Sequence, residues 1–182
     1  MRFPFYSDGI MTYQTCMLET TAMDAKTFIA GDREEMARRF RSVIETEGPI
    51  VDDLLQKRIL HSYGLSKRGN RIQPVLDEVM DSLHAKATIQ ISADGKEHKV
   101  FWPDSMEAAS FHDCRIPSGR DITEIPVVEI ANLMESLGVR PKQKLFDACA
   151  KELGFKKKGS NIRKTFALAY RLSRSAKSHV DR

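Results

Sequence analysis

Three short groups of residues in this 182-residue chain combine side chains that could carry chemistry. The first, Glu97-His98-Lys99, has the carboxylate-x-lysine spacing of metal-dependent nucleases. In such enzymes the carboxylate holds a metal ion and the lysine assists the attacking water. Asp81 or Asp94 would have to supply a second carboxylate. An exposed charged hairpin explains the same residues without catalysis, so a nuclease is kept only as an alternative.

The second group, His112-Asp113-Cys114, gathers three reactive side-chain types. Neighbouring residues in an irregular segment do not face one another as catalytic groups must. The phosphate loop G-x-x-x-x-G-K-[ST], H-E-x-x-H and G-x-S-x-G are all absent from the sequence. The three cysteines form no C-x-x-C pair, which argues against a disulfide framework and a zinc site. We therefore expect a non-enzymatic, cytoplasmic protein with no cofactor and no metal.

The third group is basic and follows Gly154. Residues 154–173 carry six lysines and arginines and no acid. Basic residues before a helix N-terminus suit phosphates, because the free N–H groups of the helix point the same way. On a helical wheel the apolar residues share one stripe and the cations lie opposite. The candidate nucleic-acid-binding residues are Lys156, Lys157, Lys158, Asn161, Arg163, Lys164, Arg171 and Arg174, with Asn161 as a base reader.

The distribution of charge along the chain also indicates that the C-terminal end is the binding region. The formal net charge of +4 divides into −6 for residues 1–139 and +10 for residues 140–182. Such asymmetry is typical of proteins with a polyanionic partner. The alternative is a solvated basic surface, but the last helix has no acid to form the i,i+4 pairs usual on such surfaces.

The elements that must position these residues are helices with one hairpin. Asp32 is placed to cap a helix that Gly48-Pro49 ends; a second runs from Val51 to Tyr63, and Asn70 is placed to cap a third. Alternating residues on either side of Asp94-Gly95 then predict a β-hairpin, with Phe101 and Trp102 packing beneath it. Three later helices begin near Pro126, Pro141 and Ser160.

Three helices followed by a hairpin is the order of a winged helix. We therefore expect a mainly α fold with a small β-hairpin, built from tandem winged-helix or helix-turn-helix-like units, the second lacking a full wing. The expected division is an N-terminal arm (1–31), a winged-helix-like unit (32–103), a linker (104–121), a second three-helix unit (122–175) and a basic tail (176–182).

The two helical groups repeat at an offset of 90 residues. Residues 43–76 share seven identities with residues 133–166, four of them in the turns Gly64–Ile72 and Gly154–Ile162. Glycines at a turn are commonly required for positive φ, which explains them but not the cations between them. The first copy keeps a secondary basic corner, Lys67, Arg68 and Arg71, whereas its third helix carries Asp77 and Asp81, which phosphates would repel.

The ordered motifs Glu47-Gly48-Pro49-Ile50, Gly64–Ile72, Phe101-Trp102-Pro103, Ile125–Ile130 and Gly154–Ile162 carry a family resemblance. Residues 32–173 resemble the uncharacterised C-terminal domain of bacterial superfamily 1 DNA helicase-related proteins. The resemblance implies a setting beside helicase motor and nuclease segments, and it supplies no catalytic residues. This chain departs from that setting because it contains no motor.

The leading hypothesis is a non-enzymatic module that binds nucleic acid, most simply duplex DNA, and is associated with helicase or nuclease machinery. The alternative is a protein–protein interaction adaptor that does not bind DNA directly. No apolar run approaches the ~20 residues of a membrane helix, so no membrane partner is expected.

Overall fold

The computed structural model describes residues 10–116 and 119–177, and within that part the chain is mainly helical with two small sheets. The chain divides into two compact units. The N-terminal unit consists of residues 14–89 and 98–108. The described residues of the C-terminal unit are 10–13, 90–97 and 109–177 with the gap noted above.

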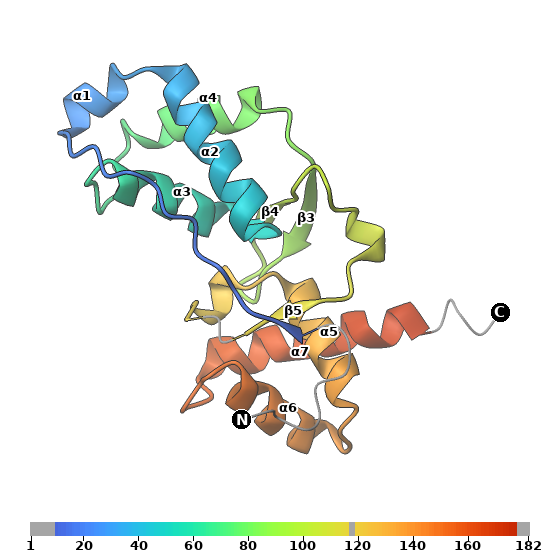
Figure 1. Cartoon of the computed structure of the whole chain (residues 1–182). Coiled ribbons are helices and arrows are strands. Elements are labelled where there is room, and N and C mark those ends of the chain that lie inside the picture. Colours follow the sequence, from blue (N-terminus) through green and yellow to red (C-terminus); the bar gives the residue numbers. More distant parts are fainter. Residues whose placement is uncertain (1–9, 117–118, 178–182) are drawn as a thin grey trace. The chain divides into compact units, whose positions relative to one another are not determined.

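The N-terminal unit contains four helices, α1 (Ala25–Ile29), α2 (Arg33–Glu47), α3 (Asp52–Ser62) and α4 (Gln73–Ser82) (Figure 1). Asp32 caps α2 as expected, because its carboxylate accepts hydrogen bonds from the N–H groups of Glu34 and Glu35. Helix α2 packs against both α3 and α4. Their apolar faces meet in one core that includes Phe40 and Leu76.

A three-stranded sheet follows in the order β2 (Ile50–Val51), β4 (Glu97–Phe101), β3 (Ala87–Ile91); its hairpin residues 90–97 are counted with the C-terminal unit and its other residues with the N-terminal unit. Strands β2 and β4 are antiparallel, with Ile50 opposite Phe101. The expected hairpin is confirmed, and Gly95 turns it with a φ of +85°. Trp102 is buried as expected, and its Nε1–H donates to Thr88 Oγ1 at 2.9 Å.

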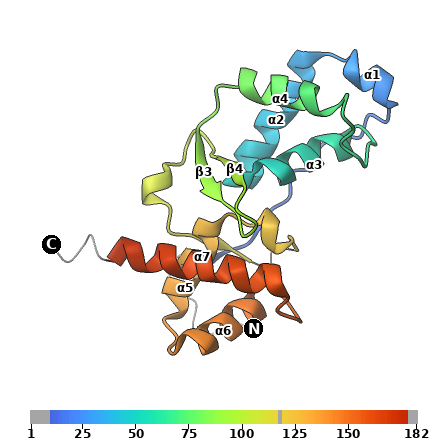
Figure 2. The same cartoon turned by 180° about the vertical axis from the view of Figure 1, so that it is seen from behind.

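The C-terminal unit contains α5 (Val127–Leu137), α6 (Lys142–Glu152) and α7 (Ser160–Lys177), with α5 packed against the other two (Figure 2). Its second sheet is a short parallel pair, β1 (Ile10–Met11) and β5 (Cys114–Arg115). Two 3₁₀ turns, η1 (Ala108–Ser110) and η2 (Ile122–Glu124), precede α5 in sequence. The core of this unit is a separate apolar cluster that includes Ile130 and Phe166.

The offset of 90 residues holds in three dimensions. Helices α3 and α6 occupy equivalent residues over their whole length, and α2 and α5 end at equivalent residues. The backbone bond from Leu65 N to Leu60 O, 2.9 Å, has its counterpart in Phe155 N to Ala150 O, 2.8 Å. Gln73 N and Arg163 N likewise bond to Gly69 O and Gly159 O, both at 3.1 Å. The repeat seen in sequence therefore corresponds to a repeated three-helix arrangement.

Two local expectations are wrong. Asn70 does not cap α4, which begins at Gln73 after a turn closed by backbone bonds to Gly69 O. Pro126 lies one residue before α5, with a ψ of 133° that is extended rather than helical. At the start of both helices, backbone hydrogen bonds close the first turn, and the residue that we expected to cap or begin the helix lies outside it.

Several expected segments extend beyond the described residues. The arm expected at 1–31 is described from residue 10, where it contains β1 and α1. The stretch expected as a linker, 104–121, contains η1 and β5, and residues 117–118 lie outside the described part. Residues 178–182 of the basic tail also lie outside it. Among the described residues, no helix combines the length and the apolar character needed to cross a bilayer.

Candidate nucleic-acid interface

Helix α7 is fixed on the core by one apolar stripe. Phe166 and Ala169 are fully buried, and the Phe166 ring meets Phe146 of α6 edge-on at 5.5 Å. Tyr170 extends the stripe and meets the same Phe146 ring at 6.2 Å. The stripe predicted from the wheel is therefore the side that packs. Because the helix is held along its length, its opposite side has a fixed direction.

The opposite side of α7 carries the four predicted cations of this helix, all exposed: Arg163, Lys164, Arg171 and Arg174. Arg163 and Lys164 make no ion pair within residues 10–116 and 119–177. Arg171 Nε donates to Ala167 O at 3.4 Å and Arg174 Nη2 to Tyr170 Oη at 3.3 Å, so both lie along their own helix. The positive charge of this face is thus not neutralised by acids on α7.

The turn before α7 presents the next part of the predicted site. Gly154 has a φ of +81°, a conformation that L side chains rarely adopt, and Phe155 N closes the turn onto Ala150 O. Lys156, Lys157 and Asn161 are exposed. Lys158 differs, because its ammonium group forms an ion pair with Asp147 of α6. One of the three predicted lysines is therefore already partnered within the unit.

The secondary basic corner of the N-terminal unit is more strongly engaged. Arg68 forms an ion pair with Asp53 and donates to Gln56 Oε1 at 2.9 Å. Gln73 Nε2 in turn donates to Asp77 Oδ1 at 2.8 Å. Lys67 and Arg71 remain exposed. At the repeat position of Arg68 and Lys158, both units use a cation to fasten the turn to the preceding helix.

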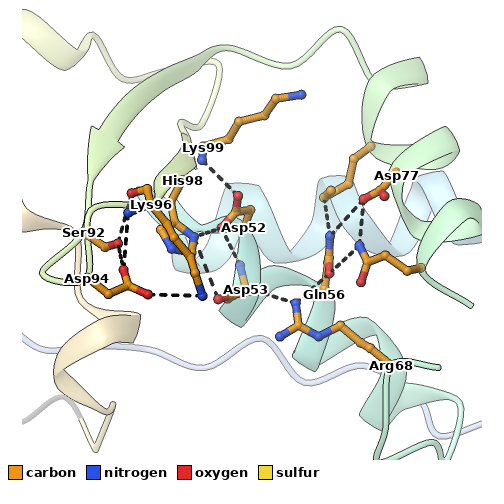
Figure 3. Close-up of polar contacts among 12 residues, drawn as sticks. Asp52, Asp53, Gln56, Arg68, Asp77, Ser92, Asp94, Lys96, His98 and Lys99 are labelled. Atoms are coloured by element: carbon orange, nitrogen blue, oxygen red, sulfur yellow. Dashed lines mark hydrogen bonds and ion pairs between the residues drawn. The ribbon is translucent and has the colours of Figure 1, made fainter. Parts of the chain in front are cut away.

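A polar cluster that the sequence analysis missed lies between α3 and β4 (Figure 3). His98 Nδ1 lies 2.8 Å from Asp52 Oδ1 and 3.8 Å from Asp53 Oδ2. Lys99 N donates to Asp52 Oδ2 at 3.0 Å, and Arg68 pairs with Asp53 Oδ1. One ligand atom from each of Asp52, Asp53 and His98 lies within 4.8 Å of the others, close enough to hold a metal ion. The same contacts fasten β4 to the start of α3 without one.

This cluster could not be found from sequence spacing, because His98 lies 46 residues from Asp52. The carboxylates named for the nuclease alternative lie elsewhere. Lys99 Nζ pairs with Asp81 Oδ1 at 3.0 Å, and Glu97 is exposed. Asp94 bonds with Ser92 and Lys96 at the tip of the hairpin, and these hydrogen bonds lower its pKa to about 2. Asp81 and Asp94, the two residues that could supply the second carboxylate of a nuclease, are thus engaged in an ion pair and in hydrogen bonds.

The side chains of the His112-Asp113-Cys114 group also lie in different environments. Cys114 is buried in β5, whereas His112 is exposed. Burial, with Glu129 nearby, raises the pKa of the Cys114 thiol well above its usual range. Burial likewise raises the pKa of Cys149 to about 12. A thiol must ionise to act as a nucleophile, so neither cysteine is poised for that chemistry.

A hollow beside the basic turn is a second feature that sequence analysis missed. It has a volume of about 420 Å³ and lies between the end of α6 and the turn. Ala150, Gly154 and Phe155 give it an apolar lining, and it is also lined by Asp147, Lys151, Lys156 and Lys158. The sequence repeat marks the turn itself, but it gives no sign of the hollow, because coverage of a turn depends on contacts between distant parts of the chain.

Comparison with known proteins finds a match to a protein family for one part of the chain. Residues 27–74 match the model of a family described as a protein of unknown function (DUF3320). The matched stretch begins within α1, ends in the first turn of α4 and covers about a quarter of the chain. No curated protein and no solved structure matches. The match supports an uncharacterised domain in the N-terminal unit and gives no activity.

Proposed function

We propose that the C-terminal unit binds nucleic acid, most simply duplex DNA, through the turn before α7 and the exposed face of that helix. The observation that carries the proposal is a rigid helix whose outward cations, Arg163, Lys164, Arg171 and Arg174, are exposed and face no acid of their own helix. Cations held in this way release counterions from phosphates on binding, which is the main source of affinity for DNA.

Each predicted residue has a defined part in this proposal. Lys156 and Lys157 are exposed in the turn that precedes α7, and we propose that they and the first free N–H groups of the helix attract the same phosphate. Asn161, exposed in the first turn, would read a base edge. Lys158 would contribute less than Lys157, because Asp147 already neutralises it. We propose no catalytic step, so the protein acts as a binding module rather than an enzyme.

The same proposal includes a winged-helix-like fold for the two units. In the N-terminal unit, α2, α3 and α4 are followed by the β3–β4 hairpin, which is the element order of a winged helix. The C-terminal unit has the three helices but no hairpin after α7 among its described residues. We propose tandem winged-helix-like units that serve helicase or nuclease machinery, on the strength of that order and of the resemblance given above.

The test is a titration of duplex DNA at several salt concentrations. The proposal predicts that log K falls linearly with log[salt], with a slope of about 0.9 for each phosphate neutralised. Reversing Arg163, Lys164 and Arg171 together to glutamate should abolish binding while the far-ultraviolet circular dichroism spectrum is retained. Reversing Lys26, Arg41 and Lys57 together, three exposed cations of the N-terminal unit outside the secondary basic corner, is the matched control and should change affinity little.

Unchanged affinity in the triple variant would overturn the assignment to α7. If even the unmodified protein does not bind duplex DNA at physiological salt, the module does not act on DNA. The adaptor alternative then becomes the better explanation of the charge pattern.

A further inference from the structure

In one of the two units, a segment of the chain itself covers the repeated turn as a bound peptide would. In the N-terminal unit, an extended stretch of the arm crosses the end of α3. Thr21 N donates to Ser62 O at 2.8 Å, and Met23 N donates to Tyr63 O at 3.1 Å. Between these two bonds Ala22 lies so close to Gly64 that a Cβ on the glycine would meet Ala22 atoms at 3.3 Å. The arm is therefore held by backbone bonds and by close apposition to a glycine.

Among residues 10–116 and 119–177, nothing covers the equivalent place in the C-terminal unit. Gly154 corresponds to Gly64 and has a similar φ, +81° against +71°. A Cβ on Gly154 would meet no atom of the described residues within 4 Å, whereas a Cβ on Gly64 would meet Ala22. The hollow of about 420 Å³ described above lies at this glycine. The two turns thus share their backbone hydrogen bonds and differ in what covers them.

The charge around this hollow indicates its ligand. Lys151, Lys156 and Lys158 line it, and its single described acid, Asp147, is paired with Lys158, which leaves Lys151 and Lys156 for a ligand. The arm that covers the counterpart, Met17–Asp24, carries Glu19 and Asp24 and no cation. An extended acidic segment therefore matches both the repeated backbone geometry and these two lysines.

We propose that this hollow is a docking site for an extended acidic peptide of a partner protein. Leu153 O, the counterpart of Tyr63 O, would accept a peptide N–H in the way that Tyr63 O accepts Met23 N. A small side chain would lie against Gly154 as Ala22 lies against Gly64, with Phe155 beside it. Acidic side chains on either side would pair with Lys151 and Lys156. This proposal does not require that the protein binds DNA, although the docking site shares Lys156 and Lys158 with the proposed nucleic-acid interface.

The experiment uses the full chain and a fluorescent peptide with the sequence of Met17–Asp24, the segment that occupies the counterpart. Fluorescence anisotropy should show saturable binding. Lys151→Glu should weaken it by up to about fivefold, the upper end of what one exposed ion pair contributes. Lys144→Glu is the matched control, because Lys144 is exposed on the same helix and does not line the hollow. A peptide with lysine at both acidic positions should not bind.

Nuclear magnetic resonance locates the peptide, because its binding should shift the amide signals of Gly154 and Phe155. Absence of saturable binding, shifts at Gly64 instead, or equal effects of the Lys151 and Lys144 reversals would each overturn the proposal. The variant with glutamate at 163, 164 and 171 should lose DNA and keep the peptide. The two proposals can therefore fail separately.

Discussion

A buried ionisable side chain occupies the same repeat position in both units, with opposite charge. Arg39 in α2 bonds to Glu19 O and Thr21 Oγ1, both at 2.9 Å, and so fastens the arm. Its counterpart Glu129 in α5 is fully buried and pairs with Arg115 and Arg120. Removing one partner of such a buried pair commonly costs about 3–5 kcal/mol, because the other charge is left uncompensated. The position therefore ties a segment that precedes the helices to α2 in one repeat, and the segment that contains Arg115 and Arg120 to α5 in the other.

Glu35 is a residue whose protonation should be visible in the stability of the protein. Hydrogen bonds from Arg38 and then Arg39 lower its pKa from 4.5 to about 2. A pKa lower in the folded state means that the unfolded chain binds more protons between these values. The stabilisation is therefore complete above pH 4.5 and is lost as the pH falls towards 2.

The first prediction follows from that sign. Glu35→Gln should flatten the dependence of the free energy of unfolding on pH between about 2 and 4.5, measured by urea denaturation at a series of pH values. Glu34→Gln is the control, because Glu34 is exposed one position away and makes no ion pair among the described residues. A Glu35→Gln profile as steep as that of the unmodified protein would contradict the assignment.

At the scale of elements, side-chain caps and backbone turns start helices in different ways. Asp32 holds two N–H groups of α2, at 2.8 and 3.4 Å. By contrast, α4 begins after a turn in which the N–H groups of Ile72 and Gln73 both bond to Gly69 O. Asn70 is exposed there and gives no cap. The same residue chemistry is used in one place and bypassed in the other because the turn geometry differs.

The second prediction compares these two positions directly. Asp32→Ala should lower the free energy of unfolding by about 1 kcal/mol, the usual cost of losing a side-chain cap. Asn70→Ala, the matched control, should change it by less than about 0.5 kcal/mol, as exposed substitutions usually do. Thermal or urea denaturation of both variants measures the difference. Equal effects would mean that Asp32 stabilises α2 no more than an ordinary surface residue.

At the scale of the whole molecule, the chain has two separate hydrophobic cores. One gathers α2, α3, α4 and the sheet, with Phe40 completely buried. The other gathers α5, α6 and α7, with Phe166 completely buried. Because no residue belongs to both clusters, a cavity in one core removes no packing from the other.

The third prediction uses the single tryptophan, Trp102, which belongs to the N-terminal unit. Phe40→Ala and Phe166→Ala should each cost about 3–5 kcal/mol in their own unit. Phe40→Ala should shift the transition followed by Trp102 fluorescence to lower denaturant. Phe166→Ala should leave that transition in place and shift the part seen only by circular dichroism. Coincident shifts by both probes in both variants would show that the units unfold as one.

Much of the local structure could be predicted because its causes are local. The apolar period of α2, the cap at Asp32 and the Asp94-Gly95 turn each act within a few residues. The repeat was visible because glycines at positive φ, such as Gly64 and Gly154, restrict residue choice at turns. The wheel also placed Arg163 and Lys164 on the exposed side of α7, because a helix fixes directions by spacing alone.

The sequence by itself thus determined helices α2 to α7, the hairpin, the 90-residue repeat and the exposed side of α7, but not α1 in the arm. Tertiary structure decided which charges remain available, since Arg68 meets Asp53 and Lys158 meets Asp147 across different elements. It also brought His98 to Asp52, and within the described part of the chain it covers Gly64 with the arm while the turn at Gly154 stays open. The physical reason is that periodicity and turn chemistry depend on near neighbours in the chain. Charge pairing and coverage depend on groups that only the fold brings together.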